Sequence, residues 1–94
     1  MFRIVVQPTA LRQIRRLGAF HAAGVLDALG KYLRDEPERP RGSRIKRLRG
    51  KQDATFRLRV GDYRVFYDVE DDKVTVTAVL HKADTAHYYR REDT

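Results

Sequence analysis

The sequence predicts an α+β fold with an N-terminal strand, a helical hairpin, a three-stranded antiparallel meander and a short C-terminal helix. The first strand joins the meander in a four-stranded sheet. Residues 2–6 form a short β-branched apolar run, and residues 8–34 carry apolar side chains at helical spacing. Residues 54–81 alternate between apolar and polar side chains over three segments separated by tight turns. A length of 94 residues is that of one domain, so 1–94 is expected to fold as one unit.

The helical hairpin is predicted from breakers and from apolar spacing. Pro8 suits the first turn of a helix, where its missing N–H costs nothing, and Gly18 ends that helix. A second helix is expected from about His21 to Arg34, ended by the prolines that follow. Its apolar stripe is expected to contain Ala22, Val25, Leu26, Leu29 and either Leu33 or Tyr32.

The charge balance indicates a polyanionic or acidic partner. Lys and Arg number 20 against 13 Asp and Glu, which gives a formal net charge of +7. The chain has no Cys, so neither disulfides nor thiolate metal sites are available, and we expect no metal or cofactor. No apolar run approaches the ~20 residues that cross a bilayer, and the start lacks a signal peptide. A cytoplasmic protein without a membrane partner is therefore expected.

Two segments flank the meander. Residues 36–52 are the most basic part of the chain and are predicted to form a surface loop that leads into the sheet. The tail, residues 84–94, is expected to contain the short helix, with Asp84 as its cap. A basic loop is often only a solvated segment, but this one is a candidate for phosphate contacts with RNA. Its candidate residues are Arg44, Lys46, Arg47, Arg49 and Lys51.

The first hairpin of the meander sorts its side chains onto two faces. If Gly61 and Asp62 form a two-residue turn, Arg59 lies directly opposite Arg64. The face toward the helices then carries Phe56, Leu58, Val60, Tyr63, Val65, Tyr67 and Val69, with Val74, Val76, Ala78 and Leu80 from the third strand. The open face carries Arg57, Arg59, Arg64, Phe66 and Asp68, with Thr75, Thr77, Val79 and His81 from the third strand and Lys82 close by.

The predicted pairing of Arg59 with Arg64 points to an anion. Like charges directly opposite each other on adjacent strands are destabilising, so a sequence selected for stability alone would avoid this pair. An anion such as a phosphate group between the two guanidinium groups would relieve the repulsion. Two other interpretations stay open: a basic face that is simply solvated, or neutralisation of one Arg by Asp68.

These segments resemble the RelE/ParE superfamily of bacterial type II toxins, most closely its RelE branch. The resemblance covers nearly the whole chain and rests on residues 48–50 (LRG), 56–60 (FRLRV), 61–67 (GDYRVFY) and 71–76 (DDKVTV). It implies a RelE-like fold and a metal-independent endoribonuclease, an mRNA interferase, that cleaves mRNA on the ribosome. It also implies a cognate antitoxin protein that forms a hetero-oligomer with the toxin and either covers its basic face or displaces its C-terminal helix.

The resemblance also implies site residues. Arg57 and Arg59 stand where well-known members carry Lys, and Arg64 matches the Arg of the family's Tyr-Arg pair. Past the last strand the match is looser: Lys82 replaces a family Arg, and Tyr89 or Tyr88 a family Tyr.

RNA cleavage requires a general base, and Arg cannot be that base because it stays protonated. The proton-transfer candidates are His81, Lys82, His87, Tyr88 and Tyr89. The expected assignment is phosphate binding by the three arginines, one proton transfer by His81 or Lys82, and the other transfer or base stacking by Tyr89.

Two alternatives come from other functional classes. ParE-type relatives share the fold but inhibit DNA gyrase as protein-binding toxins, and the incomplete C-terminal motif keeps this interpretation open. The chain could also be an inactive member of the superfamily that only binds its antitoxin.

Overall fold

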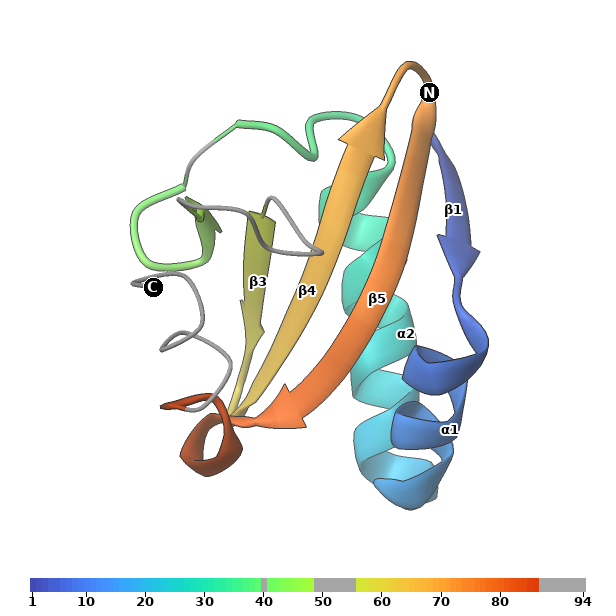
Figure 1. The fold of residues 1–94 in the computed structure, drawn as a ribbon, viewed down its shortest axis with the longest axis vertical. Helices are drawn as coiled ribbons and strands as arrows, with labels where there is room; N and C mark the ends of the chain where they lie inside the picture. Colours follow the sequence, from blue (N-terminus) through green and yellow to red (C-terminus); the bar gives the residue numbers. More distant parts are fainter. Residues whose placement is uncertain (40, 49–55, 87–94) are drawn as a thin grey trace.

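The computed structural model describes residues 1–39, 41–48 and 56–86 (Figure 1). Within these ranges, two helices lie on one face of a mixed five-stranded sheet of order β1-β5-β4-β3-β2. β1 runs parallel to β5, and the other neighbours are antiparallel. The elements are β1 (Arg3–Val6), α1 (Pro8–Arg16), α2 (Ala19–Leu33), β2 (Ile45–Arg47), β3 (Phe56–Val60), β4 (Tyr63–Glu70), β5 (Lys73–His81) and the 3-10 helix η1 (Lys82–Asp84).

The predicted α+β class is confirmed, and the sheet has one strand more than expected. β2 lies inside the segment predicted to be a loop, residues 36–52, and pairs with β3. Ile45 is fully buried in the main core, and the Arg59 N–H donates to the Arg44 carbonyl over 2.7 Å. One apolar anchor and this backbone pairing turn part of the loop into a short edge strand.

Gly18 separates the two helices, and α2 begins two residues earlier than predicted. Gly18 has a φ of 84°, a region that glycine enters without a steric penalty, and it directly precedes Ala19. The predicted apolar stripe of α2 is confirmed at Val25, Leu29 and Leu33, which are buried, whereas Leu26 is 50% exposed. Ala28 is buried in its place, because the sheet lies on the side of α2 that carries residue 28.

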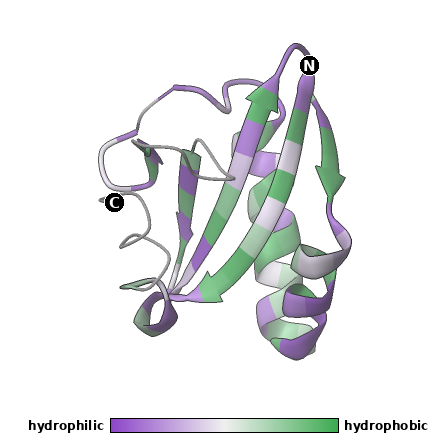
Figure 2. Cartoon of the chain, viewed as in Figure 1, coloured by the Kyte–Doolittle hydropathy of each residue, from purple (hydrophilic) through white to green (hydrophobic). Residues whose placement is uncertain are grey.

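The main core lies between the helices and the sheet. Figure 2 shows hydrophobic residues interleaved with hydrophilic ones along β3 and β4, as expected for strands with one buried face. The centre of this core is formed by Leu58, Val65 and Tyr67, which are all fully buried. Beyond the end of β1, the free edge of β5 is covered by α1, where Gln13 Oε1 accepts a 2.7 Å hydrogen bond from the Val79 N–H.

A β-bulge in the middle of β5 changes which face its side chains occupy. Phe66 is paired with Ala78, but the next residue, Tyr67, is paired with Val76, so Thr77 is extra. The Thr77 hydroxyl donates a 3.2 Å hydrogen bond to the Phe66 carbonyl.

The prediction for the end of β5 is therefore wrong from residue 78 onward. Ala78 and Leu80 lie on the open face, opposite Phe66 and Arg64. Val79 joins the main core and is only 2% exposed.

After β5 the chain makes one short turn. η1 is capped by His81, whose Nδ1 accepts from the Ala83 N–H, so Asp84 ends this turn and is not the cap of a helix. The rest of the predicted C-terminal helix falls on residues 87–94, outside the described ranges. None of the helices described is long and apolar enough to cross a membrane.

Candidate functional site

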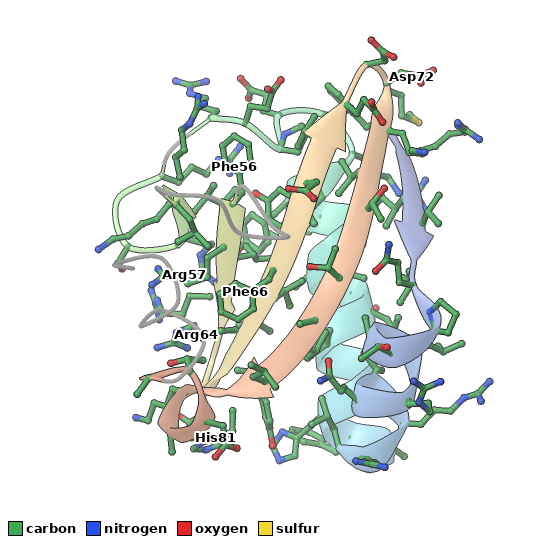
Figure 3. The ribbon with its side chains drawn as sticks, in the orientation of Figure 1. Phe56, Arg57, Arg64, Phe66, Asp72 and His81 are labelled. Atoms are coloured by element: carbon green, nitrogen blue, oxygen red, sulfur yellow. The ribbon has the colours of Figure 1, made fainter. Side chains whose placement is uncertain are left out.

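The open face of the hairpin carries three arginines, as the sequence predicts. Arg59 lies directly opposite Arg64, and Arg57 lies opposite Phe66. On the other side of Arg57, β2 places Lys46 opposite it. Figure 3 shows Arg57, Arg64 and Phe66 on the side of the sheet away from the helices. We call Arg57, Arg59 and Arg64 the arginine face.

Backbone and hydroxyl oxygens hold these side chains in place. An Nη atom of Arg57 donates 2.6 Å to the Ser43 carbonyl, and one of Arg59 donates 3.2 Å to the Ser43 hydroxyl. Arg64 donates to the carbonyls of Gly61 and Tyr63, both over 3.0 Å. These four acceptors carry no formal charge, and they fix the orientation of the guanidinium groups. Ser43 lies in the loop before β2, and no sequence pattern predicts that it contacts these arginines.

Arg59 also has an unused donor. Its Nε atom is buried and makes no hydrogen bond within the part of the chain that the structure describes. A buried N–H without a partner is costly, by about 1–3 kcal/mol, unless something satisfies it. An oxyanion bound between Arg59 and Arg64 would place acceptors next to this group.

The arginines border a small apolar cluster on the same face. Phe66 and Ala78 are buried there, and Leu48 and Leu80 pack against them. The apolar surface lowers the local dielectric and so strengthens the attraction of the neighbouring guanidinium groups for an anion. The cluster exists because the bulge turns Ala78 and Leu80 toward this face.

His81 does not share the arginine face, contrary to the sequence prediction. It is paired with Tyr63, and the two rings meet edge to face at a centroid distance of 5.5 Å. The extra residue in β5 shifts the alternation by one, which moves His81 to the side of the sheet that carries the helices. His81 is the last residue of β5 and so lies at the rim of the sheet (Figure 3).

Lys82 lies at the same end of the sheet. Its N–H donates to the Asp62 carbonyl over 2.7 Å, and its Nζ lies 3.5 Å from a carboxylate oxygen of Asp62. Both side chains are more than half exposed, so this ion pair is weak, of the order of 0–1 kcal/mol. Lys82 can therefore exchange this partner for a phosphate at little cost.

The predicted RNA-binding residues of the basic loop do not all lie on the arginine face. Lys46 lies on the arginine face, but Arg47 is paired with Phe56 and stacks its guanidinium 5.9 Å from that ring. Arg44 is half-buried and lies 4.9 Å from the ring of Tyr32. Its Nη1 atom also donates 3.1 Å to the carbonyl of Arg59, so Arg44 supports the arginine face from behind. Arg49, Lys51 and Tyr89 fall outside the described residues.

The family comparison gives an independent result. The family described as the ParE toxin of the type II toxin–antitoxin system, parDE, matches residues 4–86. This match covers most of the chain, so the protein belongs to the RelE/ParE superfamily and is a toxin of a type II toxin–antitoxin system. No curated protein sequence matches it.

Solved structures of RelE toxins have the same fold. The RelBE2 toxin–antitoxin complex of Mycobacterium tuberculosis contains a chain that is 27% identical, with a TM-score of 0.67 and coverage of 85% of this chain and 96% of that one. A mutant of Escherichia coli RelE in the free state is 25% identical, with a TM-score of 0.66 and coverages of 98% and 94%. The RelE–RelB complex of Pyrococcus horikoshii is 21% identical, with a TM-score of 0.69 and coverages of 88% and 97%.

Proposed function

We propose that this toxin is an endoribonuclease that cleaves mRNA on the ribosome. The observation that carries the proposal is the direct pairing of Arg59 with Arg64 on a face that also presents Arg57. A protein selected for stability alone gains nothing from facing guanidinium groups. A protein that stabilises a phosphate in its transition state gains from positive charge fixed in place before the reaction.

The reaction needs no external reactant. The ribose 2′-oxygen attacks the adjacent phosphorus, the P–O5′ bond breaks, and the products carry a 2′,3′-cyclic phosphate and a 5′-hydroxyl. A base accepts the 2′ proton, and an acid donates a proton to the leaving 5′-oxygen. Arg57, Arg59 and Arg64 are assigned to the phosphate oxygens, whose negative charge increases in the transition state.

Proton transfer is assigned to His81 or Lys82, together with Tyr89. His81 Nδ1 accepts from the Ala83 N–H over 3.0 Å, so the proton of the neutral ring is on Nε2. His81 must therefore release Ala83 before it can act as a base through Nδ1. The Lys82 ammonium group makes an exposed 3.5 Å ion pair with Asp62, which it can exchange for a phosphate oxygen.

A ribosome and an antitoxin are the proposed macromolecular partners. Lys46, with Arg49 and Lys51 from the same loop, is assigned to non-specific contacts with ribosomal RNA phosphates. The toxins of M. tuberculosis and P. horikoshii were solved as complexes with their antitoxins. We propose that a cognate antitoxin with acidic side chains covers the arginine face of this chain in a hetero-oligomer.

A second candidate function is supported by the family match. The matching family is that of the ParE toxin. The resemblance to ParE-type relatives implies inhibition of DNA gyrase by binding the enzyme. In that case the arginine face would bind protein carboxylates, and no residue of the chain would transfer protons.

Pulse labelling after induced expression separates the two functions. A prompt loss of protein synthesis is expected for the ribonuclease, whereas a selective loss of DNA synthesis would overturn the proposal. The triple variant R57Q/R59Q/R64Q should abolish toxicity. R12Q/R15Q/R16Q is the matched control, because it removes the same charge from the exposed side of α1 and should remain toxic.

Single variants then test the proton-transfer assignment. Tyr89→Phe and one of His81→Ala or Lys82→Ala are expected to slow cleavage of a ribosome-bound message by about 10²-fold or more, the usual contribution of a general acid or base. If all three variants cleave at the wild-type rate, none of these residues transfers a proton.

A further inference from the structure

A polar hollow of about 530 Å³ lies beside the arginine face, where β4 and β5 meet the start of α1. Its volume falls within the range of small-molecule sites, roughly 300–1,000 Å³. It is lined by Gln7, Thr9, Gln13, Asp68, Thr77, Ala78 and Leu80.

The hollow and the arginine face are continuous. Leu80 and Ala78 line the hollow and are paired with Arg64 and Phe66, respectively. Asp68 lies on the same face of β4 as Arg64, four residues further along, at a distance of about 13 Å along the strand. An RNA strand with one phosphate on the arginines therefore has a neighbouring base within reach of the hollow.

Hydrogen bonds already present fix some of the polar groups. Gln13 Oε1 accepts from the Val79 N–H, which leaves the amide nitrogen of Gln13 as the group with donor capacity. The Thr77 hydroxyl donates to the Phe66 carbonyl, so its oxygen is available as an acceptor. Asp68 supplies a carboxylate with about four acceptor positions, enough to accept from a ligand in addition to protein donors.

The carboxylate determines which part of RNA fits. A phosphate group would be repelled by Asp68, so a neutral base is the better occupant. Guanine presents two adjacent donors, N1–H and the N2 amino group, which match the two oxygens of a carboxylate. Adenine and cytosine present one donor beside an acceptor, and uracil presents one donor between two carbonyls, so each would place an acceptor against Asp68.

We propose that this hollow binds a guanine base of the RNA strand held on the arginine face, with Asp68 as the residue that determines base preference. The inference rests on the proposed ribonuclease function and adds a base subsite to it. The apolar side chains of Ala78 and Leu80 contact the ring plane, and the Gln13 amide donates toward the guanine O6.

Asp68→Asn is the decisive variant, because it replaces one acceptor by a donor at nearly constant volume. The wild type should cleave ribosome-bound messages with guanine next to the cut about tenfold or more faster than messages with adenine there, in line with ~1–3 kcal/mol for a bidentate base contact. D68N should lose this preference and favour adenine or cytosine. Asp71→Asn is the matched control: Asp71 lies in the β4–β5 turn with a φ of 55°, which Asn tolerates, and its loss removes the same charge.

Nucleotide binding gives a readout that does not depend on cleavage. In amide NMR spectra, 5′-GMP should shift Asp68 and Thr77 in the wild type and in D71N but not in D68N. Inorganic phosphate should shift only the arginine face.

The possible outcomes test the guanine site and the ribonuclease activity independently. RNA cleavage with a base preference that D68N leaves unchanged would overturn the guanine site and leave the ribonuclease intact. GMP shifts at Asp68 without any RNA cleavage would support the guanine site and overturn the ribonuclease. Equal gains in affinity for all bases in D68N and D71N would reduce the role of Asp68 to non-specific charge and overturn the inference.

Discussion

The phenol hydroxyl of Tyr67 donates a buried 2.7 Å hydrogen bond to the carbonyl oxygen of Pro37. Tyr67 is fully buried in β4, and Pro37 belongs to the segment that leaves α2. The Tyr67 ring also stacks on Phe56 of β3 at a centroid distance of 5.6 Å. This one side chain therefore joins the centre of the sheet to the start of the basic loop.

Tyr67→Phe is expected to lower the free energy of unfolding by about 1–2 kcal/mol. The variant keeps the stacked ring but leaves the Pro37 carbonyl without its donor. Urea unfolding measures the change. Tyr63→Phe is the control, because Tyr63 contacts His21 and His81 through its ring, and its change should stay within about 0.5 kcal/mol. Equal losses in the two variants would contradict the role given to the Pro37 hydrogen bond.

Alkaline pH should destabilise the protein more than it destabilises Tyr67→Phe. Burial, and secondarily the negative charge of Glu38, raise the pKa of Tyr67 above its ordinary value. Above pH ~10 the unfolded chain releases the phenol proton while the folded chain keeps it, so stability falls by about 1.4 kcal/mol per pH unit from this group. Below that pH, Tyr67 contributes no pH dependence. Urea midpoints between pH 8 and 11 should therefore fall more steeply for the wild type, and parallel curves would refute this account.

The register of the hairpin is the part of the site that the sequence could predict. Gly61 has a φ of 58° and forms a two-residue turn with Asp62, and such a turn fixes the pairing of Arg59 with Arg64. The helix boundaries near Pro8 and Gly18 were predictable for the same reason, because local backbone chemistry determines them. These features depend on residues that are close in sequence.

The position of His81 depends on contacts that the sequence does not display. Residues 74–77 alternate between Val and Thr, and residues 78–80 are all apolar, so the sequence allows either Ala78 and Leu80 or Val79 to face the core and does not mark Thr77 as an extra residue. The bulge lets Val79 enter the core and places its N–H against Gln13, which is distant in sequence. β2 was not predicted, for a related reason. A strand of three residues in which Ile45 alone is buried is too short to show the alternation of apolar and polar residues that indicates a strand.

Arg59→Thr is expected to raise the free energy of unfolding at low salt by roughly 0.2–1 kcal/mol. The substitution removes the repulsion between directly opposed guanidinium groups and introduces a good strand former. The gain should shrink at high salt, because ions screen exposed charges. Unfolding at two ionic strengths tests this, with toxicity measured in parallel. Arg47→Thr is the control, since Arg47 lies opposite Phe56 and its loss relieves no pairing of like charges. A loss of stability in Arg59→Thr at low salt would mean that its bond to Ser43 outweighs the repulsion.

Thr77→Val is expected to lower the free energy of unfolding by about 0.5–1.5 kcal/mol, because it removes a hydrogen bond that stabilises the β-bulge. This bulge places the apolar cluster beside the arginines. Valine keeps the shape and strand preference of threonine but cannot donate to the Phe66 carbonyl. Thr75→Val is the matched control, because it makes the same chemical change two residues earlier in β5, in the regular pairing with Asp68. Urea unfolding of both variants, with amide spectra to follow Phe66 and Ala78, measures the effect. If Thr75→Val costs as much as Thr77→Val, the bulge is maintained by the burial of Val79 and not by the threonine hydroxyl.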